Sequence, residues 1–405
     1  MLGVTAATAQ PPPARTGQRW LVLALATLGF AVNFWAWALL SPLGPLFKDE
    51  LGISSFQQAL LLAVPVVVGS LGRIPVGALT DRFGGRVMFP LVSAATIVPV
   101  LVLGLVGHGS LATLLCGGFF LGIGGTAFAI GVPLVNGWFP PHQRGLALGV
   151  FGVGMGGTAI SALTTVPMVK AAGVPTPFLI TAAVLAAYAV VAALLLRDPP
   201  GRERVAAPMT RRLVAVLRLP ITWQASALYA LAFGGYVAFS VYLPTYLRTA
   251  YALPQDDAAN RMAGFVVLAV LARPLGGWLS DRLRPTRVLG GALAVVVVAA
   301  AVQAFTPDLV PVGTVAFLTM AVALGAASGA VFALVAMVTP TEQVGAVTGV
   351  VGAAGGLGGF LPPLLMGVFY GSLNDYGPGL ALLAVCAGLA TLFTALLNRG
   401  SARAA

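Results

Sequence analysis

Two arginines stand in nearly the same sequence setting, 200 positions apart. Arg73 lies in Gly72-Arg73-Ile74-Pro75-Val76-Gly77-Ala78-Leu79-Thr80-Asp81-Arg82, and Arg273 lies in Ala272-Arg273-Pro274-Leu275-Gly276-Gly277-Trp278-Leu279-Ser280-Asp281-Arg282. Each follows an apolar run and precedes a charged Asp-Arg pair, so in a helix the guanidinium would lie ~12 Å inside that pair. Because arginine stays protonated and donates hydrogen bonds in a fixed fork, the pair predicts a buried site that binds an anion.

The composition predicts that these arginines lie inside a membrane. Charged residues make up 8% of the 405 residues, hydrophobic residues make up 59%, and the mean hydropathy is +0.97. Such values exclude an ordinary soluble domain. Apolar windows long enough to span a bilayer must be helical, because the hydrocarbon offers no water to backbone groups. We expect an all-α membrane protein with roughly twelve spans, near 19–41, 54–79, 86–106, 109–139, 142–168, 175–197, 220–247, 260–281, 286–305, 309–338, 342–370 and 377–398.

The basic residues predict the orientation of the chain. Most of the 22 Lys and Arg residues fall on the side that carries both termini, while Lys48, Lys170, Arg248 and Arg261 fall on the other. The positive-inside rule then places both termini in the cytoplasm. We expect the protein itself to lie in the plasma (inner) membrane. The net charge of +11 is spread over many short loops, which favours contact with the lipid bilayer and argues against a nucleic acid partner.

A second repeat indicates a duplicated half. Residues 140–152 and 340–352 share Pro, Gln and three Gly at matching positions, at the same offset as the two arginines. Parallel repeats of this kind pack about an axis normal to the membrane. We therefore expect two pseudo-symmetric six-helix bundles at 19–197 and 220–398, a disordered cytoplasmic tail at 1–18, a cytoplasmic linker at 198–219 and a short cytoplasmic tail at 399–405.

The carboxylates do not supply a counterion for the two arginines. All eleven Asp and Glu residues fall at the ends of predicted spans or in loops. A lone charge deep in the bilayer costs at least ~2.5–3.5 kcal/mol, so a mobile anion is the simplest counterion. Two alternatives stay open, namely that the arginines reach toward the cytoplasm or that they pair with backbone carbonyls.

Aromatic and glycine residues suggest the shape of that anion. Tyr229 and Phe233 are four residues apart and share a helix face, and Phe128 lies midway along its own span. Flat rings and a phenol suit a small planar anion, although each ring alone could be an ordinary core residue. Small residues at spacings of three or four allow close helix packing and also leave room for a ligand. Glycines recur at these spacings at 145, 149, 152 and 156, and again at 345, 349, 352, 356 and 359. The candidate packing and gating glycines in these segments are Gly152, Gly154, Gly156, Gly352, Gly355, Gly356, Gly358 and Gly359.

The loop after the second span resembles a motif of the major facilitator superfamily. It reads Asp81-Arg82-Phe83-Gly84-Gly85-Arg86, and Asp281 and Arg282 repeat its start in the second half. By resemblance, Asp81, Arg82, Arg86, Asp281 and Arg282 would control conformational change.

A more specific resemblance, from Trp20 to Asn398, is to the nitrate/nitrite porters of that superfamily. It rests on the segments 41–45, 72–75, 138–141 and 233–235, and above all on the glycine-rich 352–363. The resemblance implies that Arg73 and Arg273 clamp the anion, that Phe128 and Phe233 sandwich it, and that Tyr229 donates a hydrogen bond to it. The glycine segments would flex as the two halves rock between inward-open and outward-open forms.

One position departs from the family pattern. The first family signature carries an asparagine within Gly-x-Gly-Asn-x-Gly, and here Met155 stands in its place between Gly154 and Gly156. The resemblance therefore implies the loss of a polar substrate contact, which leaves the choice between nitrate, nitrite and another small anion open.

The expected function is transport of nitrate and nitrite by alternating access, without cofactor, metal or covalent chemistry, by a monomer. Two arginines facing one monovalent anion disfavour an empty site, so exchange of anions is the favoured mode. Proton-coupled uptake of nitrate or another small anion such as cyanate is the main alternative. Further alternatives are a major facilitator porter for metabolites or drugs and a membrane anion sensor. An enzyme is disfavoured, because no paired carboxylates or activated nucleophile lie in the spans.

Overall fold

All regular secondary structure in the described part of the chain is helical. The computed structural model describes residues 16–201, 209–373 and 375–403. Eleven helical segments of the described chain are long and apolar enough to cross a membrane, and some of them consist of two consecutive helices. A bent pair of helices, counted as one span, raises the number to 12. The expected all-α fold of about twelve spans is therefore confirmed. The expected tail at 1–18 lies almost entirely outside the described residues, as does the middle of the expected linker.

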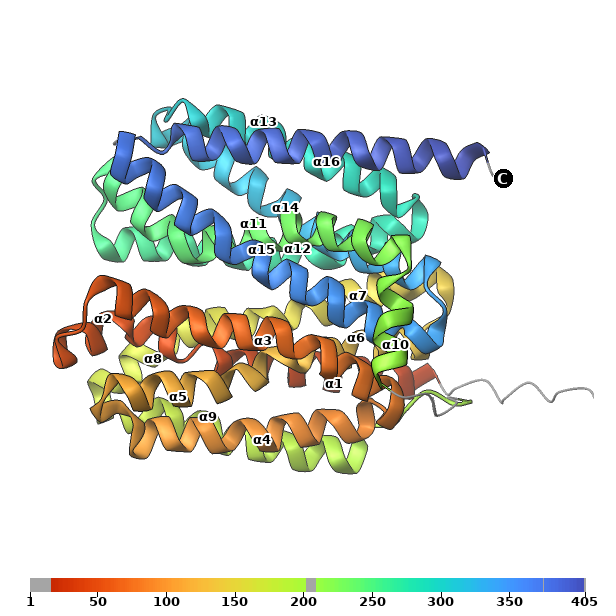
Figure 1. Cartoon of the computed structure of the whole chain (residues 1–405), viewed down its shortest axis with the longest axis horizontal. Coiled ribbons are helices and arrows are strands. Elements are labelled where there is room, and N and C mark those ends of the chain that lie inside the picture. Colours follow the sequence, from red (N-terminus) through yellow and green to blue (C-terminus); the bar gives the residue numbers. More distant parts are fainter. Residues whose placement is uncertain (1–15, 202–208, 374, 404–405) are drawn as a thin grey trace, which may run out of the picture.

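The helices form two groups that lie side by side (Figure 1). The first group comprises α1 (Thr16–Trp37), α2 (Leu40–Leu51), α3 (Ser55–Phe83), α4 (Gly85–Leu105), α5 (Leu111–Leu121), α6 (Ala127–Trp138), α7 (Arg144–Gly152), α8 (Gly157–Ala172) and α9 (Pro175–Leu195). After α10 (Met209–Leu217), the second comprises α11 (Pro220–Tyr251), α12 (Gln255–Arg282), α13 (Pro285–Ala304), α14 (Thr314–Val338), α15 (Val344–Leu373) and α16 (Gly377–Arg403). The short helix α10 meets α11 at an angle of 77°.

Two spans of the first half change helix type midway. A 3₁₀ turn at Gly122–Thr126 joins α5 to α6, and a second at Val153–Gly156 joins α7 to α8. Both turns are rich in glycine, whose weak helix propensity favours such a change. A mid-helix 3₁₀ turn leaves carbonyls outside the regular ladder, so these two turns can supply acceptors in the middle of the bundle.

The halves meet through two pairs of glycines related by the duplication. A Cβ on Gly77 of α3 would collide with the backbone of Gly345 at the start of α15, and a Cβ on Gly277 of α12 would collide with Gly145 at the start of α7. Gly277 lies 200 residues after Gly77, and Gly345 lies 200 residues after Gly145, so the two pairs are equivalent with the halves exchanged. Close backbone approach is the usual way to pack helices in lipid, where burial of apolar side chains adds little.

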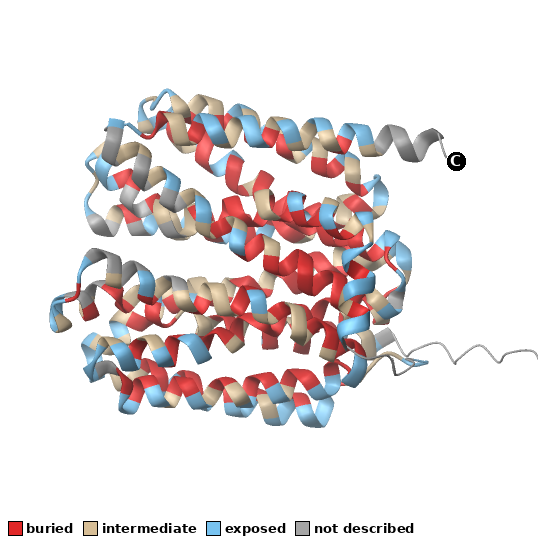
Figure 2. Cartoon of the chain, in the orientation of Figure 1, coloured by how far each residue is buried: buried red, intermediate tan, exposed pale blue. Residues whose placement is uncertain are grey.

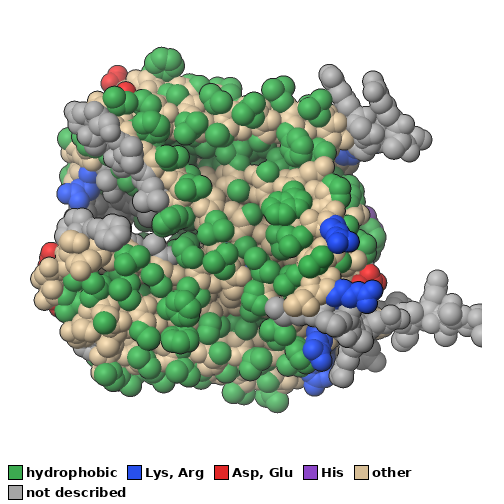
Figure 3. All heavy atoms as spheres, viewed as in Figure 1, with side chains coloured by type: hydrophobic (Ala, Val, Ile, Leu, Met, Phe, Trp, Pro, Cys, Tyr) green, Lys and Arg blue, Asp and Glu red, His purple; other side chains and the backbone are tan. Residues whose placement is uncertain are grey.

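Buried residues gather where the two halves meet, and the outer helices expose apolar side chains (Figure 2). The exposed set includes Leu194 at 64% and Leu389 at 63% exposure. Figure 3 shows that hydrophobic side chains cover the visible flank, while described Lys and Arg side chains concentrate at the end that carries α10. This distribution is typical of a bundle whose flank faces lipid.

We expect Gly276→Ala to destabilise the second half. Its Cβ would lie 2.5 Å from the Cα atom of Ala326, so α12 and α14 would have to separate. Overpacking of this kind costs ~1–3 kcal/mol, more than the ~1 kcal/mol gained in helix propensity. Thermal unfolding of the detergent-solubilised protein should show a lower midpoint. Gly264→Ala on the same helix is the control, because no atom lies within 4 Å of its Cβ, and it should leave the midpoint unchanged or raise it.

Candidate anion-binding site

Arg73 lies deep in the bundle and bridges its two halves. The side chain comes from α3 and is 1% exposed. Its Nε donates to the carbonyl of Gly125 in the first 3₁₀ turn at 3.0 Å, and its NH1 donates to the carbonyl of Gly352 on α15 at 2.7 Å. The second acceptor belongs to the opposite half, so this hydrogen bond forms only when the two halves lie together around Arg73.

Arg273 occupies the corresponding position on α12 but has weaker partners. It is 2% exposed, its NH2 lies 3.2 Å from the hydroxyl of Tyr229, and its NH1 contacts the sulfur of Met155 in the second 3₁₀ turn. Its Nε has no hydrogen-bond partner among the described residues. The Nε of Arg273 is therefore a donor without a partner in the described residues, whereas the Nε of Arg73 donates to a carbonyl.

The three expected aromatic residues stack on one another beside the two arginines. The Tyr229 and Phe233 rings stack with their centroids 4.8 Å apart and an angle of 10° between their planes. The Phe128 and Tyr229 rings also stack, with centroids 6.2 Å apart and an angle of 9° between their planes. The guanidinium carbon of Arg73 lies 5.6 Å from the Phe128 centroid and 5.7 Å from that of Phe233. The guanidinium carbon of Arg273 lies 5.8 Å from the same Phe233 ring. The two charges thus converge on one aromatic residue, at distances where cation–π attraction operates.

Further rings complete the site and were not predicted from sequence. Phe34 of α1 lies 5.8 Å from the Arg73 guanidinium, and Phe332 of α14 packs edge-on against Phe128 at 4.8 Å and Tyr229 at 4.6 Å. No spacing signal separates these two residues from the other phenylalanines of the core. Only the packing of α1 and α14 against the arginine-bearing helices reveals them.

Within the described residues, Arg73 and Arg273 have no carboxylate partner. The ion pairs found among the described side chains join Arg212 to Asp81 and Arg261 to Asp257. Both Arg73 and Arg273 are buried, so neither reaches toward the membrane surface. The carbonyl alternative holds for Arg73, but carbonyl dipoles do not neutralise its charge. Two positive charges therefore share a low-dielectric site that offers no fixed negative charge within the described part of the chain.

Seven of the eight predicted glycines fall into two groups. Gly152 faces Arg273, so close that a Cβ would lie 2.7 Å from the Arg273 Nε, while Gly352 and Gly355 face Arg73 and the Tyr229 ring. These positions leave room for the site side chains. The others pack helices together: Gly154 against Phe30 of α1, Gly356 against Ser70 of α3, and Gly358 and Gly359 against α11. Gly156 has no neighbour nearer than 3.9 Å to its would-be Cβ, so packing does not require a glycine there.

Asp81 joins the halves at the end that carries α10. Its carboxylate accepts hydrogen bonds from the backbone N–H groups of Gly345 at 3.1 Å and Ala346 at 2.9 Å, at the start of α15. A carboxylate at a helix N-terminus satisfies free N–H groups and interacts favourably with the helix dipole. Arg212 of α10 also pairs with Asp81, and it donates to the carbonyls of Ala78 at 2.8 Å and Glu342 at 3.2 Å. Arg212 was not among the predicted residues, because nothing in the linker sequence distinguishes it from its basic neighbours.

Asp281 makes the equivalent contact across the other seam. It accepts from the N–H groups of Gly145 and Leu146, both at 2.7 Å, at the start of α7. The remaining loop-motif residues lie outside these seams. Arg82 and Arg282 are exposed, with the guanidinium carbon of Arg82 5.2 Å from the Phe83 ring centroid and that of Arg282 4.2 Å from the Trp278 ring centroid. The backbone N–H of Arg86 donates a hydrogen bond to the Asp198 carboxylate at 3.1 Å. The structure thus brings the two aspartates, but not the motif arginines, into the contact between halves.

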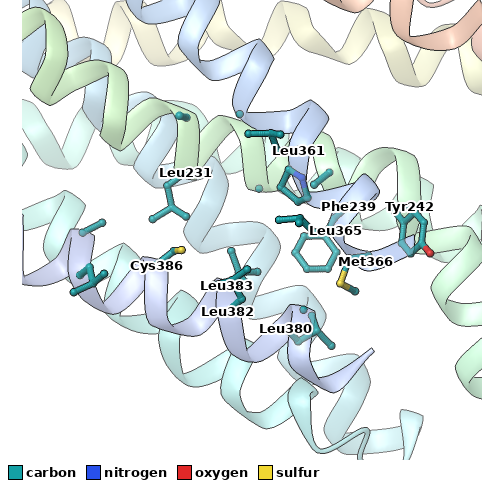
Figure 4. Close-up of a pocket in the computed structure, with 18 of the residues that line it drawn as sticks. Leu231, Phe239, Tyr242, Leu361, Leu365, Met366, Leu380, Leu382, Leu383 and Cys386 are labelled. Atoms are coloured by element: carbon teal, nitrogen blue, oxygen red, sulfur yellow. The ribbon is translucent and has the colours of Figure 1, made fainter. Parts of the chain in front are cut away.

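A separate apolar cavity of about 540 Å³ lies between α11, α15 and α16 (Figure 4). Its lining includes Leu231, Phe239, Leu365 and Leu383, and none of its lining residues is charged. It offers a small anion no positive charge, and neither arginine is among its lining residues. The arginine pair, rather than this cavity, is the candidate anion site.

Comparison with known proteins agrees with this architecture. The Major Facilitator Superfamily profile matches residues 26–363. Two solved structures share the fold. The structure of the human organic anion transporter MFSD10 aligns with a TM-score of 0.77 at 16% identity, covering 95% of this chain and 100% of that one. The structure of FucP in the outward conformation aligns with a TM-score of 0.73 at 17% identity, covering 94% of this chain and 99% of that one. The chain is thus a membrane transporter of the major facilitator class and not an enzyme.

Two relatives narrow the assignment. The chain is 50% identical over 379 residues to the probable nitrate/nitrite transporter NarK2 of Mycobacterium tuberculosis, covering 93% of this chain and 96% of the relative. It is 34% identical over 362 residues to the nitrite extrusion protein of Bacillus subtilis, covering 89% and 90%. The chain therefore belongs to the nitrate/nitrite porter family of the Major Facilitator Superfamily, as its sequence motifs predicted.

We expect Asp81→Asn to loosen the seam between α3 and α15. Hydrogen bonds to a charged group contribute ~1.5–3 kcal/mol, so a cysteine at Thr348, buried on α15, should be alkylated at least ~10-fold faster. The measurement uses Thr348→Cys in a background with Cys116 and Cys386 replaced by Ser. Asp281→Asn is the matched comparison and should have a smaller effect at Thr348, because Asp281 closes the other seam. Equal labelling rates with and without Asp81→Asn would contradict this role.

Proposed function

We propose that this protein moves nitrate and nitrite across the plasma (inner) membrane by alternating access, as a monomer with both termini in the cytoplasm. The observation that carries the proposal is the pair Arg73 and Arg273, each at most 2% exposed and without a carboxylate partner in the described residues. A monovalent oxyanion at this site would supply the missing negative charge. The names of the relatives, a nitrate/nitrite transporter and a nitrite extrusion protein, point to the same class of cargo.

The geometry of the site favours a small planar anion. The Phe128, Tyr229 and Phe233 rings are within about 10° of parallel, with Tyr229 between the other two in the stacking order. Guanidinium groups bind planar oxyanions through paired N–H donors, and a phenol hydroxyl adds one more donor. Arg73 and Arg273 both approach Phe233, so one anion near this ring can contact both. Bulkier metabolites would have to displace the rings.

Movement of the halves would proceed by breaking one set of contacts at a time. Asp81 and Asp281 hold the halves together at the end that carries α10. That end carries the concentration of Lys and Arg visible in Figure 3, which supports a cytoplasmic location. In this conformation the cytoplasmic route would be closed, and release of the two aspartates would open it.

Exchange of one anion for another is the mode that the charges favour. An empty site would hold two uncompensated cations while the halves reorient, and this is costly in a low-dielectric environment. Among the described side chains, the groups that contact Arg73 and Arg273 are carbonyls, a thioether, a phenol and aromatic rings. None of these relays protons near neutral pH, so we infer that a second anion accompanies the return step.

Arg73→Lys and Arg273→Lys should each weaken nitrate binding at least ~30-fold. A lysine keeps the charge but cannot reproduce the planar fork, and removing a partner from a buried charge interaction costs ~2–5 kcal/mol. Isothermal titration of the purified protein with nitrate and nitrite measures the affinity. Arg261→Lys on α12 is the control, since its surface pair with Asp257 is remote from the site and should not alter the affinity. Unchanged affinity in both site variants would indicate a porter for another class of substrate.

Reconstituted vesicles should take up labelled nitrite much faster when nitrate or nitrite is present inside. The expected rate in anion-loaded vesicles exceeds that in empty vesicles by at least ~10-fold, because the empty site reorients slowly. An imposed pH gradient should have no effect on this rate at constant membrane potential. Uptake into empty vesicles that follows the pH gradient would favour proton-coupled uptake instead, and addition of cyanate as a competitor would test the breadth of the site.

A further inference from the structure

The two site arginines are held by acceptors of different strength. Arg73 donates to two carbonyl oxygens, at 3.0 and 2.7 Å. Arg273 contacts the Met155 sulfur and the Tyr229 hydroxyl, and its Nε is buried without a partner in the described residues. Carbonyl oxygen is a strong acceptor, whereas a thioether sulfur is a weak one. Arg273 is therefore the arginine whose present partners are more easily replaced.

The backbone of the second 3₁₀ turn fixes Met155 beside Arg273. The turn runs from Val153 to Gly156, and its Gly154 packs against Phe30 of α1 so closely that a Cβ would lie 2.7 Å from the Phe30 Cβ. Met155 is 2% exposed, so its side chain has left both lipid and water. The turn thus directs one flexible side chain from the first half onto a cation of the second half.

The duplication does not repeat this contact. The position equivalent to Met155 in the second half is Gly355, where a Cβ would collide with the Tyr229 ring. The NH1 of Arg73 accordingly donates to the carbonyl of Gly352, whereas the NH1 of Arg273 contacts the Met155 thioether. The methionine is an addition to one arginine only, and packing symmetry does not account for it.

The thioether has the properties of a temporary partner. It is uncharged, accepts hydrogen bonds weakly and ends a side chain with three rotatable bonds, so it can move aside at small cost. A nitrate or nitrite oxygen carries negative charge and forms a much stronger, charge-assisted bond with the same N–H groups. An anion that enters the site will compete with the sulfur for NH1 and will displace it.

We propose that the Met155 thioether is a displaceable cap on Arg273, which holds the guanidinium in the empty site and yields its place to one oxygen of the incoming anion. This inference rests on the proposed function. It makes Met155 a positioning residue that sets affinity, because the energy needed to displace the sulfur is subtracted from the energy of anion binding. A stronger cap would weaken binding, and removal of the cap would tighten it.

Nitrate titration of the purified full-length protein tests the cap through two substitutions with opposite expected effects. Met155→Leu preserves the volume but removes the acceptor, so nitrate should bind ~3–10-fold tighter. Met155→Gln offers an amide oxygen, a stronger acceptor at similar reach, so nitrate should bind ~3–10-fold more weakly. A purely structural role for Met155 would weaken binding in both variants, so the difference in sign identifies the cap.

Met320→Leu is the matched control. Met320 of α14 is fully buried, like Met155, but it precedes Phe332 by twelve residues and lies ~18 Å from it along the helix. Its substitution should leave nitrate affinity unchanged while reporting the general cost of replacing a buried methionine by leucine. Elution as a monodisperse peak in size-exclusion chromatography confirms that each variant is folded before titration.

The outcomes separate this inference from the function on which it rests. Nitrate binding by the wild type, with weaker or equal binding by the Leu variant, would overturn the cap and leave the anion site intact. Tighter binding by the Gln variant would also overturn it, because residue 155 would then contact the anion directly. A wild type that binds neither nitrate nor nitrite would overturn the proposed function and the cap together.

Discussion

The structure depends on two positive charges that are buried without a fixed counterion in the described part of the chain. Burying a guanidinium is costly, and the protein offsets that cost only in part, through two carbonyls for Arg73 and a phenol and a thioether for Arg273. Arg73 receives one of its acceptors from the opposite half, so its environment changes whenever the halves move. In the proposed function, the same deficit that would destabilise an ordinary core would supply both the attraction for an anion and the link between binding and conformation.

Glycine lets the helices bring these charges together. Broken helices at Gly122–Thr126 and Val153–Gly156 place a carbonyl and a side chain beside the two arginines. The crossed pairs Gly77 with Gly345 and Gly145 with Gly277 allow the two halves to touch backbone to backbone. A bundle with larger residues at these positions would separate the halves, and Arg73 could not reach Gly352.

Repetition made much of this molecule predictable from sequence. Arg73, Arg273 and the two loop aspartates repeat at one offset, and a charge in an apolar span is conspicuous, so the helical fold and the burial of both arginines could be predicted, while their role in anion binding stays a prediction. Phe34, Phe332 and Arg212 were not predicted, because phenylalanine is common in any apolar helix and arginine is common in any basic loop. Met155 was interpreted as the loss of a polar contact, whereas its packing against Arg273 depends on how the 3₁₀ turn orients the side chain, which spacing does not encode.

The linker helix α10 makes the two seams between the halves unequal. Arg212 touches Asp81, Ala78 and Glu342, so it pins both sides of the α3–α15 seam, and it is only 8% exposed. The α7–α12 seam is closed by Asp281, which pairs with none of the described arginines. We therefore expect the halves to part first along α7 and α12 and to pivot about the pinned side, so that the cargo would leave by a lateral, one-sided opening.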